Sequence, residues 1–142
     1  MNQDVQRAAF NFENYKFTEF FFKYTPIEGK ITYDVKFDPK GIYKLKTGNF
    51  QLTLDIIIAH SEDRNHVIGS ATIVANFRFD NATSKDDIPS YFFGNSIAII
   101  YPYIRAFVSN MTTQAQWSPL LLPLLNLSNL EAHLKANTTE EE

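Results

Sequence analysis

The sequence of 142 residues contains no cysteine. Without cysteine the chain can form neither a disulfide framework nor a thiolate metal site. This absence agrees with a protein of the reducing cytosol, and we expect a cytoplasmic location. The length predicts one domain that is large enough to have a core of its own.

An excess of positive charge is also missing. The net charge of −3 and the isoelectric point near 5.6 argue against a nucleic-acid-binding protein, which would present a basic face. Residues 106–130 are uncharged and exceed the roughly 20 apolar residues that a membrane span needs, but polar side chains, Pro119 and Pro123 interrupt them. The first residues lack the basic-then-apolar order of a signal peptide. We therefore expect a soluble protein without membrane insertion.

Residue patterns of common catalytic and metal sites are missing as well. His60, His66 and His133 show no metal-site spacing; a polar hairpin turn predicts solvated histidines at 60 and 66, although a hairpin can also bring them together as two ligands. Asp55, His60 and Ser61 are triad residue types, but they lie at one strand end without a Gly-x-Ser-x-Gly elbow. Phosphate-loop and dinucleotide motifs are absent. We expect no enzymatic activity, no cofactor and no metal.

Apolar residues in the first 80 positions predict four strands. They cover residues 12–24, 31–37 with a short continuation at 42–45, 50–58 and 66–79, and polar turns separate them. Because no helical pattern intervenes, we expect an antiparallel sheet. The first strand is apolar on both faces and includes Phe17 and Phe21, so one face is expected to contact another subunit.

The second half of the chain predicts helices. Residues 96–115 carry apolar side chains at spacings of three and four, as an amphipathic helix requires. Pro102 costs about 3 kcal/mol or more inside a helix, so it predicts either a kink or the first turn. Ser128 and Glu131 form a capping-box pattern before a short second helix.

Strands followed by helices predict an α+β fold. The expected organisation is a flexible N-terminal arm at residues 1–10, a single domain at residues 11–136 and a disordered acidic tail at residues 137–142, which ends in three glutamates.

A leucine-rich stretch after the long helix is the candidate functional site. Two prolines prevent an ordinary helix there, so successive side chains cannot all point the same way. About half of them are expected to cover the sheet, since burying a leucine stabilises a fold by about 1.5–3 kcal/mol, and the others to face a partner or ligand. Such a groove suits extended apolar segments of varied sequence. The candidate groove residues are Trp117, Leu120, Leu121, Leu122, Leu124, Leu125, Leu127, Leu130 and Leu134.

Several motifs in this half resemble the SecB family of bacterial export chaperones. Tyr101-Pro102-Tyr103-Ile104-Arg105 is similar to that family's Phe-Pro-Tyr-Ala-Arg. Trp117-Ser118-Pro119 follows it, and Leu125-Asn126-Leu127 corresponds to a Leu-Asn-Leu motif. The resemblance covers residues 91–136 well, and the strand half agrees in order and length.

This resemblance implies a four-stranded antiparallel sheet followed by a long helix, an apolar loop and a short lid helix. It also implies a homotetramer, a dimer of dimers whose long helices lie between two sheets. Members of the family hold unfolded preproteins without ATP and pass them to the SecA motor, and the groove corresponds here to Trp117 through Leu134. The implied oligomer interface comprises Phe17, Phe21, Ile100, Ile104, Phe107 and Met111.

The chain departs from the family at the motor-docking surface. The motor binds acidic positions of the sheet, of which Glu19 matches one, whereas Lys23 and Ser70 replace two others. Motor docking through Glu19 is therefore expected to be weak. Some family members instead serve as chaperones of toxin–antitoxin systems, and the sequence leaves that role open. Two further alternatives are an oligomeric small-molecule or lipid-binding module that uses the same pocket, and an adaptor for one fixed partner.

Overall fold

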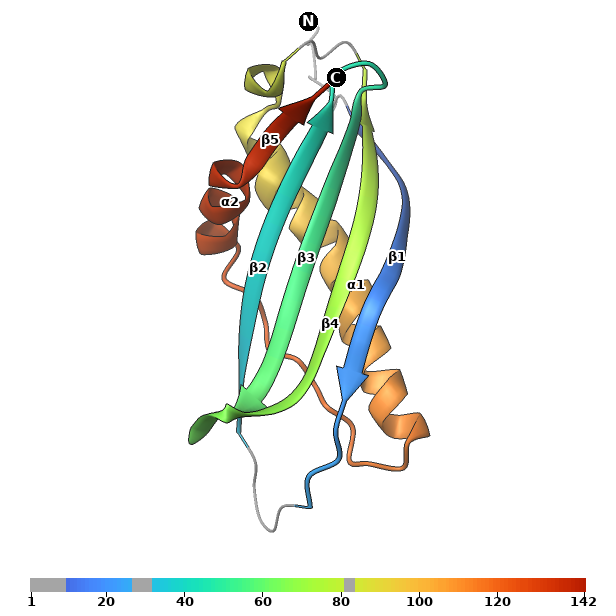
Figure 1. Ribbon diagram of the computed structural model, residues 1–142, viewed down its shortest axis with the longest axis vertical. Coiled ribbons are helices and arrows are strands. Elements are labelled where there is room, and N and C mark those ends of the chain that lie inside the picture. The colour runs from blue at the N-terminus through green and yellow to red at the C-terminus, as the bar shows by residue number, and fades with distance from the viewer. Residues whose placement is uncertain (1–9, 27–31, 81–83) are drawn as a thin grey trace, which may run out of the picture.

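The computed structural model describes residues 10–26, 32–80 and 84–142. The predicted flexible arm at residues 1–10 therefore lies outside the described residues, apart from Phe10. Figure 1 shows one long sheet with a long helix running behind it. In chain order the elements are β1 (Phe10–Phe22), β2 (Tyr33–Lys44), β3 (Asn49–His60), β4 (Asp63–Phe79), a 3₁₀ helix (Lys85–Asp87), α1 (Ser90–Gln114), α2 (Leu127–Ala136) and β5 (Thr138–Glu141).

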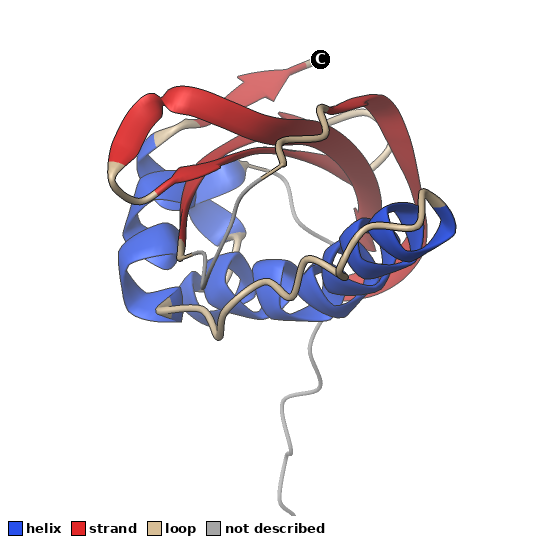
Figure 2. Ribbon diagram, turned by 90° about the horizontal axis from the view of Figure 1, so that it is seen from below, coloured by secondary structure: helices blue, strands red, loops and turns tan. Residues whose placement is uncertain are grey.

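The sheet has the strand order β1-β4-β3-β2-β5, and its first four strands are antiparallel. Both helices lie on one side of the curved sheet (Figure 2), so the molecule has two layers. This arrangement confirms the predicted α+β fold, in which antiparallel strands come first and helices follow. Within the described residues, no helix is long and apolar enough to cross a membrane.

The core lies between the inner face of the sheet and α1. Alternate residues of β3, from Phe50 to Ile58, have at most 1% of their surface exposed, as the period of two in the sequence predicted. Ile97, Ile100, Ile104 and Val108 meet them from α1 and are equally buried. Ile100 and Ile104 were predicted to form an oligomer interface, and this is wrong, because they pack on the sheet of their own chain.

Two bulges explain why β1 is apolar on both parities. The pairing of β1 with β4 shifts between Phe12 and Asn14 and again between Phe17 and Glu19. Each extra residue moves the following side chains to the other face. Phe17 and Phe20 therefore both reach Phe107 on α1, with ring centroids 4.0 Å and 5.0 Å away. Aromatic rings of both parities on β1 thus reach α1.

The acidic C-terminus is not the disordered tail that the sequence predicted. Thr138–Glu141 form β5, which pairs in parallel with Gly41–Lys44 of β2 (Figure 1). Thr138 is buried and its hydroxyl donates to the carbonyl oxygen of Leu134 at 2.7 Å. The sequence did not predict this strand because residues 138–141 are all polar, and main-chain pairing needs no apolar side chains.

Pro102 lies inside α1 rather than in its first turn. Its ring nitrogen has no hydrogen to donate to the carbonyl of Ala98, four residues earlier. The burial of Tyr101 and Ile104 on either side of it holds this part of the helix against the core.

Candidate functional site

The candidate site begins where α1 ends. The N–H of Trp117 donates to the carbonyl of Thr112 at 2.9 Å, and that of Gln116 donates to Thr113 at 3.0 Å. This pair of bonds is a Schellman motif, and Gln116 adopts the left-handed φ of 67° that the motif requires. The chain turns sharply there and sends the following loop, residues 117–126, back along the sheet.

Two side chains of α1 hold this loop in place. The Thr112 hydroxyl is buried; it donates to the carbonyl of Val108 at 2.9 Å and accepts from the N–H of Leu120 at 3.0 Å. The Tyr101 hydroxyl donates to the carbonyl of Pro123 at 2.5 Å. Since both bonds join the loop to one rigid helix, the loop is fixed at two points three residues apart.

The fixed loop divides its leucines between core and solvent. Leu120 and Leu122 are 3% and 4% exposed, whereas Leu121 and Leu124 are 72% and 86% exposed. Leu125 is half-buried against the core. Leu121 and Leu124 lie three residues apart on one fixed loop beside the half-buried Leu125 and together extend an apolar patch, so they are the leading contact residues of the site.

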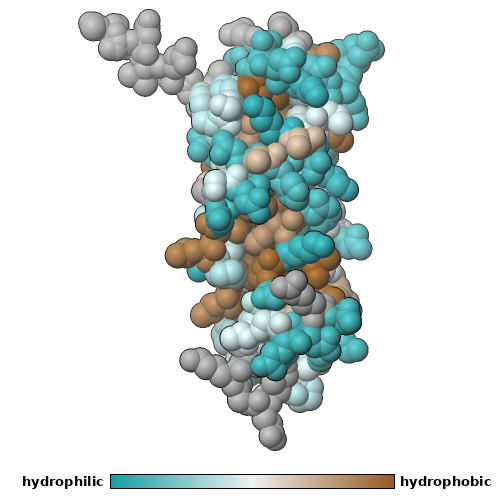
Figure 3. All heavy atoms as spheres, turned by 90° about the vertical axis from the view of Figure 1, so that its left-hand side faces the viewer, coloured by the Kyte–Doolittle hydropathy of each residue, from teal (hydrophilic) through white to brown (hydrophobic). Residues whose placement is uncertain are grey.

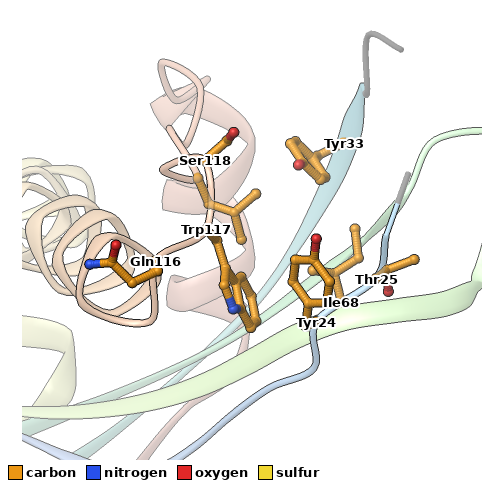
Figure 4. A pocket seen from close by; sticks show the side chains of 8 residues that line it. Tyr24, Thr25, Tyr33, Ile68, Gln116, Trp117 and Ser118 are labelled. Atoms are coloured by element: carbon orange, nitrogen blue, oxygen red, sulfur yellow. The ribbon is translucent and has the colours of Figure 1, made fainter. Parts of the chain in front are cut away.

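Two small clefts lie along the loop, and Tyr33 and Leu120 line both of them. The first, of about 220 Å³, is lined by Tyr24, Thr25, Tyr33, Ile68, Gln116, Trp117, Ser118 and Leu120. In Figure 4 the rings of Tyr24 and Trp117 lie next to each other, with centroids 5.6 Å apart and their planes tilted by 56°, and Tyr33 lies across the cleft. Burial raises the pKa of the Tyr33 phenol, so its hydroxyl is a neutral hydrogen-bonding group. This end of the site is aromatic with polar rims.

The second cleft, of about 210 Å³, continues the first toward α2. It is lined by Thr32, Tyr33, Val35, Ile58, Leu120, Leu121, Leu122 and Pro123. Because Tyr33 and Leu120 line both clefts, the clefts are neighbours between β2 and the loop. We call the two clefts together the β2 groove.

An open strand edge runs beside the β2 groove. Within the described residues, the outer edge of β2 is paired with β5 only along Gly41–Lys44. The N–H groups of Gly41 and Leu45 point to that side, since their acceptors lie there. Backbone groups alternate in direction along a strand, so the N–H and C=O of Tyr33, Val35 and Phe37 point to the same edge. The groove therefore offers apolar side chains and unpaired main-chain groups together.

Figure 3 shows the face of the molecule that carries this edge and the loop. Apolar side chains gather near the middle of a surface that is otherwise mostly hydrophilic, and some of them protrude from it. An apolar patch with a polar rim is typical of a contact site.

The second helix contributes to the core more than to the groove. Leu130 and Leu134, which were predicted to face the groove, are 7% and 0% exposed and line neither cleft, so in this structure they serve the core. The side chain of Leu127 lies outside the described part of the structure. The capping-box prediction is also wrong: Asn126 is the N-cap of α2, and the Ser128 hydroxyl donates to the Asn126 side-chain oxygen at 2.8 Å.

The other predicted site residues lie away from the groove. Phe107 is half-buried against β1, whereas Phe21 and Met111 are 51% and 36% exposed and remain predicted interface residues. Glu19 lies on the outer face of the sheet, where the strand register places Thr72 and then Asp55 beside it. The Thr72 hydroxyl donates to Asp55 at 2.5 Å. Docking of a motor at Glu19 remains a prediction.

The hairpin between β3 and β4 does bring two histidines together. The rings of His60 and His66 stack with centroids 6.2 Å apart, and His66 Nε2 is hydrogen-bonded to the Thr25 hydroxyl at 3.0 Å. In the described part of the chain, no group of three or more histidine, aspartate or glutamate side chains is placed to hold a metal ion.

The chain and its structure were compared with those of known proteins. No protein-family model matches the chain. The uncharacterized protein MJ0357 of Methanocaldococcus jannaschii is 28% identical over 146 residues, which cover 96% of this chain and 94% of that protein. Among solved structures, the Mycobacterium tuberculosis SecB-like chaperone Rv1957, in complex with a ChAD peptide from the Rv1956 HigA1 antitoxin, matches with a TM-score of 0.67. This match covers 84% of this chain and 91% of that chain at 18% identity. The chain has a SecB-like fold.

The SecB-like fold brings residues into the groove that the sequence did not single out. These residues line the first cleft opposite Trp117: Tyr24 and Thr25 follow β1, Tyr33 begins β2, and Ile68 lies on β4. Tyr33 had one indication in the sequence, because the alternation of apolar and polar residues along β2 turns its side chain inward. The others had none, because only the sheet register and the path of the loop make them neighbours.

Proposed function

We propose that the protein is an ATP-independent chaperone that binds non-native polypeptides in the β2 groove. The observation that carries this proposal is the exposure of Leu121 and Leu124 on a fixed loop, next to an unpaired strand edge. An unfolded segment exposes both apolar side chains and unpaired backbone groups, and the groove offers a partner for each. No step of this binding requires nucleotide hydrolysis.

The groove suits clients of varied sequence. Main-chain pairing with a strand edge does not depend on side-chain identity, and it supplies affinity while pockets for alternate side chains supply preference. The two clefts, of about 220 and 210 Å³, follow one another along the loop beside the strand edge. This arrangement suits successive side chains of an extended peptide.

We also propose that the chain assembles with copies of itself into a homotetramer, a dimer of dimers. Within the described residues, β1 is paired only on its β4 side, so its other edge is free along Phe10–Phe22. Exposed aromatic side chains lie on this strand and on the adjacent part of α1, among them Tyr15, Phe20 and Tyr103. Light scattering tests the assembly, and a monomeric mass would contradict it.

Two kinds of client protein are compatible with such a groove. Export would hand preproteins to the SecA motor, whereas a toxin–antitoxin role would protect an antitoxin segment. The solved SecB-like chaperone of M. tuberculosis binds an antitoxin peptide, which supports the second role, while Glu19 supports the first only weakly. Co-purification after tagging the chain in its own host distinguishes them, since the retained partner is either the motor with preproteins or an antitoxin.

A client-aggregation assay tests the proposed function. We expect the protein to suppress light scattering of guanidinium-denatured citrate synthase on dilution. Leu121→Asp and Leu124→Asp should each raise the chaperone concentration needed about tenfold, because each replaces an apolar contact worth about 1.5–3 kcal/mol with a charge.

The matched control is Tyr91→Asp. Tyr91 is 41% exposed and lies in the first turn of α1, at the other end of the helix from the loop. This variant adds the same charge at an exposed apolar position and should suppress scattering like the unchanged protein. Full suppression by both leucine variants, with assembly intact, would rule out this groove as the client site.

A further inference from the structure

The outer edge of β2 is interrupted near its middle by Pro39. By the alternation that turns Gly41 outward, the backbone nitrogen of residue 39 faces the open edge, but proline carries no hydrogen there. Its carbonyl oxygen is also engaged, because the Asn137 side-chain amide donates to it at 3.2 Å. At Pro39, therefore, a new strand would find no N–H donor, and the carbonyl oxygen there already accepts a hydrogen bond.

Beyond Pro39 the edge is filled by β5. The N–H of Gly41 donates to the carbonyl of Asn137 at 3.2 Å, and the N–H of Leu45 donates to Glu141 at 2.8 Å. The Glu140 carboxylate accepts from the N–H of Lys85 at 2.6 Å, which ties β5 to the 3₁₀ helix as well.

Gly41 makes room for this arrangement. A Cβ atom at that position would lie 2.8 Å from the Thr138 hydroxyl oxygen and 2.4 Å from the Phe50 ring. With Thr138 buried and bonded to α2, β5 is anchored by side chain as well as main chain.

Before Pro39, no other described segment of the chain pairs with the edge. Tyr33 and Val35 turn their side chains into the β2 groove and their backbone groups toward the open edge. A strand advances about 3.3 Å per residue, so a partner chain paired along Tyr33–Phe37 would be about five residues long.

We propose that Pro39, Asn137 and β5 act as an end stop that limits a bound client strand to about five residues paired with Tyr33–Phe37. This inference rests on the proposed function and adds a length limit to it. The groove then selects short apolar segments, and a long client is held by several such segments on different subunits rather than by one extended pairing.

Peptides of graded length test the end stop on the unchanged protein. Fluorescently labelled peptides with alternating leucine and threonine, of roughly five, eight and eleven residues, are titrated and followed by anisotropy. We expect the dissociation constant to change by less than about twofold between five and eleven residues, because no further main-chain bonds form beyond Phe37.

Hydrogen exchange with the same peptides locates the bound strand. Both the shortest and the longest peptide should protect the amides of Tyr33, Val35 and Phe37 and leave the existing protection of Gly41 and Leu45 unchanged. Faster exchange at Gly41 and Leu45 with the longest peptide would mean that β5 is displaced, and this result would overturn the end stop.

A combined variant removes the stop. Pro39→Val restores an N–H with a residue suited to strands, and truncation after Thr138 removes residues 139–142 while keeping the Thr138 contact with α2. In this variant the longest peptide should bind about threefold or more tightly than the shortest. Truncation alone is the matched control and should keep the flat length dependence, since Pro39 remains.

The outcomes separate the two proposals. Failure of every peptide to bind would overturn the proposed function and the end stop with it. Binding that strengthens steadily with length in the unchanged protein would overturn the end stop alone. The anisotropy and exchange measurements on the unchanged protein decide this even if the combined variant does not fold.

Discussion

The hydroxyl of Tyr101 donates a hydrogen bond to the backbone carbonyl oxygen of Pro123, with 2.5 Å between the two oxygens. The tyrosine is 6% exposed, and the Arg105 guanidinium carbon lies 6.0 Å from the centre of its ring. Burial raises the pKa of the Tyr101 phenol and the charge of Arg105 lowers it in part, so the phenol remains a donor. This bond attaches the leucine loop to the middle of α1.

Tyr101→Phe should loosen the loop. The change removes the donor but keeps the ring, so we expect the free energy of unfolding to fall by about 0.5–1.5 kcal/mol. Urea denaturation measures the loss, and hydrogen exchange should show faster exchange at the amides of Leu121 to Leu125. Tyr103→Phe is the control, because its ring is 40% exposed. An equal loss in both variants would contradict the role of the Pro123 bond.

The tyrosines also predict how stability depends on pH. Burial is the largest cause of the raised pKa values of Tyr33, Tyr43 and Tyr101. The tyrosines of the unfolded chain then ionise first, near pH 10, so the tyrosine contribution to stability is constant below that pH and falls as the pH rises toward the folded-state values. Urea titrations from neutral pH upward should show this fall, and Tyr101→Phe should make it less steep. An unchanged slope in the variant would contradict the assignment.

Thr112→Val should destabilise the protein more than the same substitution at its exposed neighbour Thr113. Valine preserves the shape but leaves the buried N–H of Leu120 without its acceptor, at a cost of about 1–3 kcal/mol. Thr113 is exposed and its hydroxyl donates to Ser109 at 2.7 Å, so Thr113→Val should change stability by less than about 0.5 kcal/mol. Thermal unfolding of both variants provides the comparison, and similar melting temperatures would count against the Thr112 anchor.

Gln116→Gly should stabilise the protein. Gln116 holds a left-handed φ of 67°, which is strained for a residue with a Cβ atom. We expect a gain of about 1 kcal/mol from relief of that strain. Ala115→Gly, one residue earlier at an ordinary φ of −77°, should instead lose about 0.4–1 kcal/mol. If both substitutions destabilise the chain in guanidinium titrations, the turn does not carry this strain.

Two glycines should respond oppositely to alanine. At Gly41 the new Cβ would lie 2.4 Å from the Phe50 ring, so Gly41→Ala should cost about 1–3 kcal/mol and disturb β5. At Gly94, inside α1, the nearest atom lies 3.4 Å away, and Gly94→Ala should gain about 0.5–1 kcal/mol through helix propensity. Calorimetry on the pair tests both, and a stable Gly41→Ala variant would show that Phe50 and β5 can move.

Much of the fold could be predicted because it follows from local patterns. The alternation from Phe50 to Ile58 identified the inner face of β3, and spacings of three and four identified the buried face of α1. In the site, the prolines correctly indicated a loop whose leucines divide between core and solvent. The sequence pattern could not say which leucines face the core and which face solvent, because Leu121 and Leu122 have the same side chain. The hydrogen bonds at Leu120 and Pro123 decide which of the two is buried.

The sequence by itself determined the order of the first four strands and the two helices, the apolar faces and the resemblance to the SecB family, because each depends on residues close together in the chain. Tertiary structure decided the rest. The bulges redirected the aromatics of β1, backbone pairing turned the acidic C-terminus into β5, and the Tyr101 bond to Pro123 placed the loop beside a strand edge. These outcomes depend on contacts between distant segments, whose geometry no local spacing encodes.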